Sequence, residues 1–360
     1  MMTDPWAEAV GEAADTTAPL DTGQLRFGEQ LTAEQRAEME NLLRGYSDVL
    51  TDRIGCTKLI QHDITVTDET PCFQPSYRIP EALREKVEEE LRSMEESGVI
   101  QYDPYNTWNS PLIVVRKSDG NILVNNFIEL NKRTVPEPYT MTRSDELLNR
   151  VAGARLISKI DLKKSFFQCE LSRASQKYTG FSTPNGVYSY RRMAMGLRNS
   201  SSTMQKFIDH VLRNAHRYAD ALLDDILIFS TTFDLHMRHV KDILDRLRAA
   251  GLTVNVQKCH FATNAVKIFG YWVEDGKIYP DKDEVAVISA WEEPKTKKQL
   301  KSFVGLCGYF RSHIKDFAKI AFPLTELLGL INWCGGQINK LPSTRLRQRW
   351  YENRFCVLRI

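Results

Sequence analysis

The chain has 360 residues, 42% of them hydrophobic and 26% charged, with a formal net charge of +2. This composition supports a sizeable core in roughly two to three domains, and the lack of an apolar run near ~20 residues excludes a membrane span. The acidic N-terminus excludes a secretory signal, and seven cysteines without C-x-x-C spacing favour reduced thiols in an intracellular protein with no membrane partner.

The N-terminal segment reads as a leader. Residues 1–27 are rich in Ala, Thr, Asp and Gly and lack periodicity, which predicts a flexible chain. Within it, "LDTG" at 20–23 matches the active-site triplet of aspartic proteases. We interpret it as a turn, because no preceding segment could build the sheet that a protease site requires. A capping box from Thr32 to Gln35 then begins a helix that runs to about Leu43.

Residues 80–98 carry Leu, Val and Met at three- and four-residue spacings after a proline, which predicts an amphipathic helix that ends at Gly98. Two β-rich runs on either side of "SDGN" predict a hairpin, and Lys117 lies next to its turn.

A later apolar and β-branched run ends at Asp161, which places this carboxylate at the end of a strand. A short strand and a helix are expected within residues 183–215. A further helix is expected from Asp234 to Ala250, with Gly251 as its C-cap.

Two adjacent carboxylates, Asp224 and Asp225, lie between apolar runs in "ALLDDILIFS". One interpretation is a solvated hairpin tip with the two aspartates at its central positions. The other is a metal site, because adjacent carboxylates repel unless a divalent cation neutralises them. With Asp161 on a separate strand, the pair fits two-metal phosphoryl transfer, in which carboxylates hold two Mg²⁺ ions roughly 3.5 to 4 Å apart.

Four residues with the chemistry of zinc ligands offer a rival site: His236, His239, Cys259 and His260. Two of them fall on a predicted helix and the other two are adjacent, unlike the spaced pairs of structural zinc sites. We therefore favour no zinc at these positions.

The C-terminal part changes character. A strand pair is predicted around residues 275–276. After it, a second capping box, Thr296 to Gln299, with apolar residues along one face, predicts a helical module. Residues 331–360 show no sustained period and carry six Lys/Arg against one Glu, so we expect an irregular basic tail.

Taken in order, these motifs resemble the reverse transcriptases of gypsy-type long-terminal-repeat retrotransposons and retroviruses, from about Phe27 to Leu328. "IDLKKSFFQ" resembles the family's first catalytic motif, "FSTPNGVYSYRRMAMGLRNSSSTMQ" its nucleotide-pocket segment and "LLDDILIFS" its second catalytic motif. The resemblance implies an α+β fold, the right-hand polymerase of fingers, palm and thumb, with a helical C-terminal connector. The implied domains are a leader and protease-to-polymerase linker with one short helix (1–76), fingers and palm (77–275), thumb or connector helices (276–330) and an irregular basic tail (331–360).

The resemblance also implies an activity, namely RNA-directed DNA polymerisation from deoxynucleoside triphosphates on a primed RNA or DNA template, with two Mg²⁺ ions or Mn²⁺. It implies Asp161 and Asp224 as ligands of both metal ions and Asp225 as the adjacent carboxylate of the catalytic motif. The other implied site residues are Lys117, Phe166, Met195 and Gly196 for the nucleotide, and Phe269, Gly270 and Tyr271 for the grip on the primer end. Two alternatives stay open: Phe166 as plain core packing, and Lys117 as an exposed turn lysine.

The sequence departs from the family pattern at several positions. Leu222 replaces a usual Tyr before the catalytic Asp, and Ala194 replaces a usual Pro. In the fingers, Asn126 and Ile128 stand for an Asp and an Arg, and the phosphate-binding Arg has no counterpart. These departures favour, as an alternative, a decayed or co-opted copy that folds and binds nucleic acid without polymerising. A second alternative is a protein-binding scaffold, which would show no salt-sensitive binding to a primer-template. The residues after Leu328 are too few for the family's ribonuclease H or integrase domain.

Overall fold

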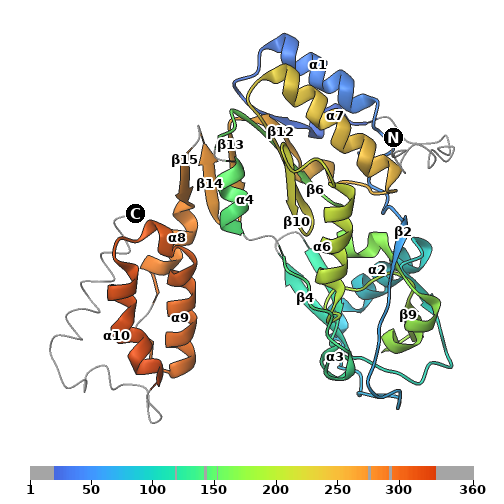
Figure 1. Ribbon diagram of the computed structural model, residues 1–360. Helices are drawn as coiled ribbons and strands as arrows, with labels where there is room; N and C mark the ends of the chain where they lie inside the picture. The colour runs from blue at the N-terminus through green and yellow to red at the C-terminus, as the bar shows by residue number, and fades with distance from the viewer. Residues whose placement is uncertain are drawn as a thin grey trace. The chain divides into compact units, whose positions relative to one another are not determined.

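The computed structural model describes residues 20–117, 120–141, 144–151, 153–274, 277–291 and 294–329. The chain divides into two compact units, residues 1–264 and 265–360 (Figure 1). The hairpin expected with the fingers and palm, residues 265–274, therefore belongs to the C-terminal unit. The names and bounds of fingers, palm and thumb stay a prediction.

The main sheet of the larger unit has the strand order β1 (Arg26–Phe27), β12 (His260–Thr263), β6 (Leu156–Asp161), β11 (Asp225–Ser230) and β10 (Ala219–Leu222). The central strand β6 runs antiparallel to both β11 and β12, and β1 runs parallel to β12. In β11 every residue after Asp225 is buried. A continuous apolar run of this kind, rather than an alternating one, is typical of a strand that is covered on both faces.

Helices cover this sheet and supply the core. The α-helices of the larger unit are α1 (Ala33–Arg44), α2 (Arg84–Glu96), α3 (Ile128–Arg133), α4 (Ser144–Val151), α5 (Arg173–Gln176), α6 (Ser200–Val211) and α7 (Phe233–Ala249). The apolar faces of α6 and α7 enter one core cluster with the sheet, and α1 lies along α7 (Figure 1). The predicted capping box at Thr32 is confirmed. Gly251 has the positive φ expected beyond the end of α7.

The segment from residue 20 to 62, which the sequence assigns to a leader and linker, takes part in this fold. It contributes β1, α1 and β2 (Thr57–His62), and β2 pairs with β7 (Cys169–Leu171) in parallel. Leu25, Met39 and Leu43 are buried in the main core cluster. Their burial ties this segment to the sheet.

A second core cluster lies around α2. It is bordered by the sheet β3 (Ile100–Tyr102), β9 (Gly186–Tyr190) and β8 (Phe181–Thr183), and by the hairpin β4 (Leu112–Lys117) and β5 (Gly120–Asn125). The amphipathic pattern of α2 buries Val87, Leu91 and Met94, as its spacing predicts. The helix follows a 3₁₀ turn and stops before Gly98, at φ +67°.

The smaller unit combines an antiparallel sheet and helices. The sheet is β13 (Ala265–Ile268), β14 (Tyr271–Glu274) and β15 (Lys277–Pro280), and the helices are α8 (Lys282–Ser289), α9 (Lys297–Tyr309) and α10 (Phe317–Gly329). The predicted capping box from Thr296 to Gln299 is confirmed at the start of α9. The predicted tail over 331–360 lies outside the described residues.

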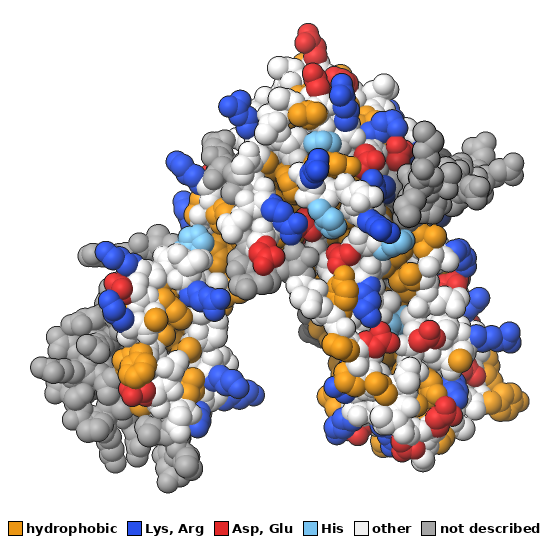
Figure 2. All heavy atoms as spheres, viewed as in Figure 1, with side chains coloured by type: hydrophobic (Ala, Val, Ile, Leu, Met, Phe, Trp, Pro, Cys, Tyr) orange, Lys and Arg blue, Asp and Glu red, His pale blue; other side chains and the backbone are white. Residues whose placement is uncertain are grey.

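Short 3₁₀ helices join these elements: η1 (Thr22–Gln24), η2 (Glu81–Leu83), η3 (Ser165–Gln168), η4 (Lys177–Thr179), η5 (Val256–Lys258) and η6 (Arg311–His313). On the face of the larger unit shown in Figure 2, Lys and Arg side chains are interspersed with Asp and Glu. Among the described residues, no helix has the length and apolar character needed to cross a membrane.

Candidate active site

The site is organised by the pairing of β6 with β11. Asp161 is the last residue of β6 and Asp225 the first residue of β11, and the two are direct partners in the antiparallel ladder. Directly opposite residues project to the same face of a sheet, with Cβ atoms roughly 4.5 to 5.5 Å apart. Two distant parts of the sequence therefore bring their carboxylates together at one end of the central strands.

The hairpin turn differs from the expectation by one residue. Leu222 pairs with Asp225, so the two-residue loop consists of Leu223 and Asp224. The expectation that both aspartates occupy the tip is wrong, because the ladder takes Asp225 into β11. Leu223 has φ +57°, a conformation that Leu rarely adopts and that costs of the order of 1–3 kcal/mol.

A buried glutamine supports this strained turn. Gln205 on α6 is fully buried, and its Oε1 accepts a hydrogen bond of 2.8 Å from the Leu223 amide. Its Nε2 donates to the Ala221 carbonyl at 3.1 Å and to Asp209 Oδ1 at 2.8 Å. The sequence analysis missed this residue, although a glutamine between Met204 and Phe207 on an apolar helix face was an available signal.

The protonation of the carboxylates is shifted by their surroundings. Burial raises the pKa of Asp161 to about 6, and the charges of Asp224 and Asp225 add to this while Lys258 opposes it. Burial also raises the pKa of Asp224. Asp225 forms an ion pair of 2.9 Å with Lys159. A half-buried carboxylate cluster of this kind is stabilised by an added cation.

The side chains of Asp161 and Asp224 have the chemistry needed to bind a divalent cation. Mg²⁺ binds carboxylate oxygens, and Asp161 and Asp224 offer such oxygens in a cluster whose pKa values are raised by burial. Within the described part of the chain, no three His, Cys, Asp or Glu side chains already converge on one point. In the present arrangement, Asp225 is directed to Lys159 instead.

The predicted nucleotide residues lie on several elements of the larger unit. Phe166, in η3, is partly buried and packs against the main core cluster. Met195 is 49% exposed. Gly196 has φ +91°, and its carbonyl accepts a 2.8 Å hydrogen bond from Asn131, a supporting residue that the sequence analysis did not identify. The backbone of Lys117 ends β4, and its side chain lies outside the described part of the structure.

The predicted primer-grip residues belong to the smaller unit. Phe269 (φ +49°) and Gly270 (φ +74°) form the two-residue loop between β13 and β14, the arrangement of a type I′ hairpin turn. The Tyr309 hydroxyl donates to the Phe269 carbonyl at 2.7 Å, and the Tyr271 hydroxyl donates to the Tyr309 carbonyl at 2.8 Å. The hairpin is thus tied to α9, and its role at a primer stays a prediction.

Two residues of the rival zinc site, His236 and Cys259, have other partners. His236 is buried and uses both ring nitrogens, Nε2 with Ser158 Oγ at 2.7 Å and Nδ1 with Ser230 Oγ at 2.9 Å. Cys259 Sγ donates to the Asn255 carbonyl at 3.1 Å. These side chains form a hydrogen-bonded core, which argues against zinc.

Comparisons with known proteins show which sequences and structures this chain is similar to. The family described as "Reverse transcriptase (RNA-dependent DNA polymerase)" matches residues 117–273. The chain is 30% identical to the retrovirus-related Pol polyprotein from transposon 297 of Drosophila melanogaster over 86% of its length, and 33% identical to that from transposon opus over 79%. It spans 30% and 29% of those two polyproteins.

Solved structures show the same fold. A foamy viral protease-reverse transcriptase in complex with dsDNA superposes with a TM-score of 0.83 at 19% identity, covering 98% of this chain and 62% of that one. A foamy viral protease-reverse transcriptase in complex with an RNA/DNA hybrid gives 0.76 at 19% identity, with 96% and 47% covered. The predicted α+β polymerase fold is confirmed.

The fold is the polymerase fold. More particularly, the chain contains a reverse transcriptase domain related to the Pol polyproteins of gypsy- and Tf2-type long-terminal-repeat retrotransposons, at about 30% identity.

Proposed function

We propose that this chain is an RNA-directed DNA polymerase that adds deoxynucleotides to a primer 3′-hydroxyl. The observation that supports this most is the β6–β11 register, which pairs Asp225 with Asp161 and leaves Asp224 in the adjoining turn. Two distant motifs thus bring Asp161 and Asp225 opposite each other at one edge of the sheet, with Asp224 next to them in the chain. Phosphoryl transfer requires such a group at the reacting phosphate.

Asp161 and Asp224 are the proposed ligands of two Mg²⁺ ions, for which Mn²⁺ could substitute. When bound, such ions activate the attacking 3′-oxygen and stabilise the leaving pyrophosphate. The chain's own contribution is placement, because Gln205 holds the turn and the ladder holds Asp161. Lys159 neutralises Asp225 and so lowers the repulsion within the cluster.

The other predicted residues are proposed to position substrates. Phe166 would exclude the ribonucleotide 2′-hydroxyl by its bulk, and Met195 and Gly196 would form the wall under the nucleotide. Lys117 would contact the triphosphate, and the Phe269 to Tyr271 hairpin would grip the primer. The foamy viral enzymes in complex with dsDNA and an RNA/DNA hybrid support a primer-template as the partner.

Primer extension on an RNA template, with Mg²⁺ or Mn²⁺, tests the proposal. Asp161→Asn and Asp224→Asn should each abolish extension while leaving primer-template affinity within about twofold, because each removes a carboxylate and not a backbone-phosphate contact. Asp63→Asn is a matched control, since Asp63 is exposed and lies on the loop after β2. Full extension by either active-site variant would refute the assignment.

A second candidate function is nucleic-acid binding without polymerisation. Leu222, the partner of Asp225 in the ladder, supports it because the residue lacks the hydroxyl of the family's usual Tyr. For this candidate we expect salt-sensitive binding to a primer-template and no extension with either metal ion. A protein-binding scaffold would show neither.

A further inference from the structure

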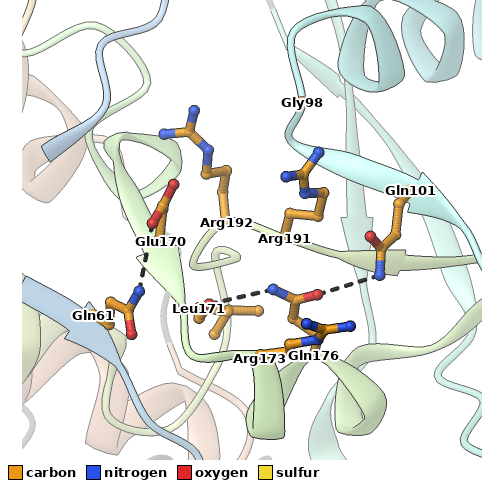
Figure 3. A pocket seen from close by; sticks show the side chains of 9 residues that line it. All are labelled: Gln61, Gly98, Gln101, Glu170, Leu171, Arg173, Gln176, Arg191 and Arg192. Atoms are coloured by element: carbon orange, nitrogen blue, oxygen red, sulfur yellow. Dashed lines mark hydrogen bonds between the residues drawn. The ribbon is translucent and has the colours of Figure 1, made fainter. Parts of the chain in front are cut away.

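A polar cavity of about 480 Å³ lies in the larger unit, and none of its nine lining residues belongs to the carboxylate cluster (Figure 3). The lining comes from segments far apart in the sequence. They are β2 with Gln61, the α2–β3 segment with Gly98 and Gln101, β7 with Glu170 and Leu171, α5 with Arg173 and Gln176, and the end of β9 with Arg191 and Arg192.

The charge of the cavity is strongly unbalanced. Three arginines line it against one carboxylate, Glu170. That carboxylate is already neutralised, since Lys58 Nζ lies 2.6 Å from Glu170 Oε1. In the described part of the chain, the side chains of Arg173 and Arg191 have no hydrogen-bond or ion-pair partner. Among the described residues, the positive charge of Arg173 and Arg191 in the cavity is therefore not compensated by an ion pair.

Backbone hydrogen bonds hold Arg191 in place. The Arg191 amide donates to the Val99 carbonyl at 2.9 Å, and the Arg191 carbonyl accepts from the Leu171 amide at 2.9 Å. The Arg192 guanidinium reaches the Gly55 and Phe167 carbonyls only at 3.3 and 3.4 Å. A fixed backbone that presents guanidinium groups with no partner, or with long hydrogen bonds only, reduces the entropy lost when an anion binds.

Amides complete the lining. Gln101 Nε2 donates to Gln176 Oε1 at 3.2 Å, and Gln176 Nε2 donates to the Leu171 carbonyl at 3.4 Å, as the dashed lines in Figure 3 show. The lining contains no aromatic side chain, and Leu171 is its one large apolar residue. A base would find no stacking surface here, so recognition rests on charge and hydrogen bonds.

We propose that this cavity is a phosphate-binding site outside the carboxylate cluster. Guanidinium groups bind phosphate oxygens in a bidentate manner, and three of them match the charge of a polyphosphate or of successive phosphodiesters. The phosphate comes from a free polyphosphate, including that of a nucleotide, or from the backbone of a single nucleic-acid strand. The site does not depend on polymerase activity, because its residues are separate from Asp161 and Asp224.

The test measures binding to the full chain in EDTA, so that metal-dependent binding of triphosphates is silent. Inorganic tripolyphosphate is titrated by calorimetry, and a short labelled oligothymidylate by fluorescence anisotropy. The double variant Arg173→Ala/Arg191→Ala should weaken at least one probe about tenfold. Arg217→Ala, which removes another exposed arginine, between α6 and β10, should leave both probes within about twofold of the parent protein.

The two probes distinguish the sources of phosphate. Loss of tripolyphosphate binding alone identifies a free polyphosphate, and loss of oligothymidylate binding alone or of both identifies a strand backbone as a ligand. The double variant Arg173→Lys/Arg191→Lys keeps the charge without the bidentate geometry and should show an intermediate loss. Unchanged affinity for both probes in a folded Arg173→Ala/Arg191→Ala protein would overturn the proposal.

Discussion

Replacing Gln205 with Met tests how the catalytic turn is held. Met keeps the length and apolar bulk of the side chain but removes its hydrogen bonds to the Leu223 amide and the Ala221 carbonyl. A buried backbone group that loses its partner costs about 1 to 3 kcal/mol. Ala221 is fully buried and Leu223 partly so. We therefore expect a loss of about 2 to 4 kcal/mol in the free energy of unfolding.

The same substitution should reduce extension beyond its effect on stability. Leu223 is held at φ +57°, and without its acceptor the loop can relax and displace Asp224. We expect the extension rate of the folded variant to fall roughly tenfold, which corresponds to ~1.4 kcal/mol in the barrier.

Urea unfolding and single-nucleotide extension measure the two effects. Lys206→Met is the matched control, because Lys206 neighbours Gln205 on α6 and makes only surface contacts. It loses an ion pair with Glu137, worth about 0 to 1 kcal/mol at a surface, and a cation–π contact with Tyr139. If Gln205→Met and Lys206→Met unfold at the same urea concentration and extend equally fast, the reasoning about the turn is refuted.

Three further predictions concern single side chains. Burial lowers the pKa of His236 to about 3 from 6.5, so at acidic pH the unfolded chain binds more protons than the folded protein. The contribution of His236 to stability should therefore be complete above about pH 6.5 and decline toward pH 3, and thermal melts of His236→Gln should show a weaker decline. Leu222→Tyr should raise the extension rate if the missing hydroxyl limits the enzyme, whereas an unchanged rate in a stable protein would place the limit in the nucleotide pocket. Phe166→Ala should raise the ratio of ribonucleotide to deoxynucleotide incorporation. A lower melting temperature with unchanged selectivity would instead identify Phe166 as a core-packing residue; a fully buried Phe→Ala change costs about 3 to 5 kcal/mol.

The sequence was a good guide where local chemistry decides structure. Both capping boxes and the amphipathic pattern of α2 led to the observed helices, because caps and periodic burial act within a few turns. Asp161 was correctly placed at the end of a strand, since the apolar run before it needs burial.

Long-range pairing was harder to predict. The observed hairpin tip differs from the predicted one by one residue, because its position depends on the pairing of β10 with β11 and on Gln205 of α6. Neither contact can be read from the local sequence. The boundary near residue 264 also follows from packing, since β14 pairs with β13 and β15 and Tyr271 packs beside Phe310. The roles of the site residues stay predictions until the variants are measured.

The hydrogen bonds of His236 have a consequence for strand alignment. Ser158 on β6 and Ser230 on β11 both bond to this one imidazole on α7. Sliding either strand by one residue would turn its serine to the opposite face and leave a buried ring nitrogen unpaired. The same slip would separate Asp161 from Asp225, which are partners at the other end of the ladder. The hydrogen bonds of the buried His236 imidazole therefore favour the strand alignment in which Asp161 and Asp225 are direct partners.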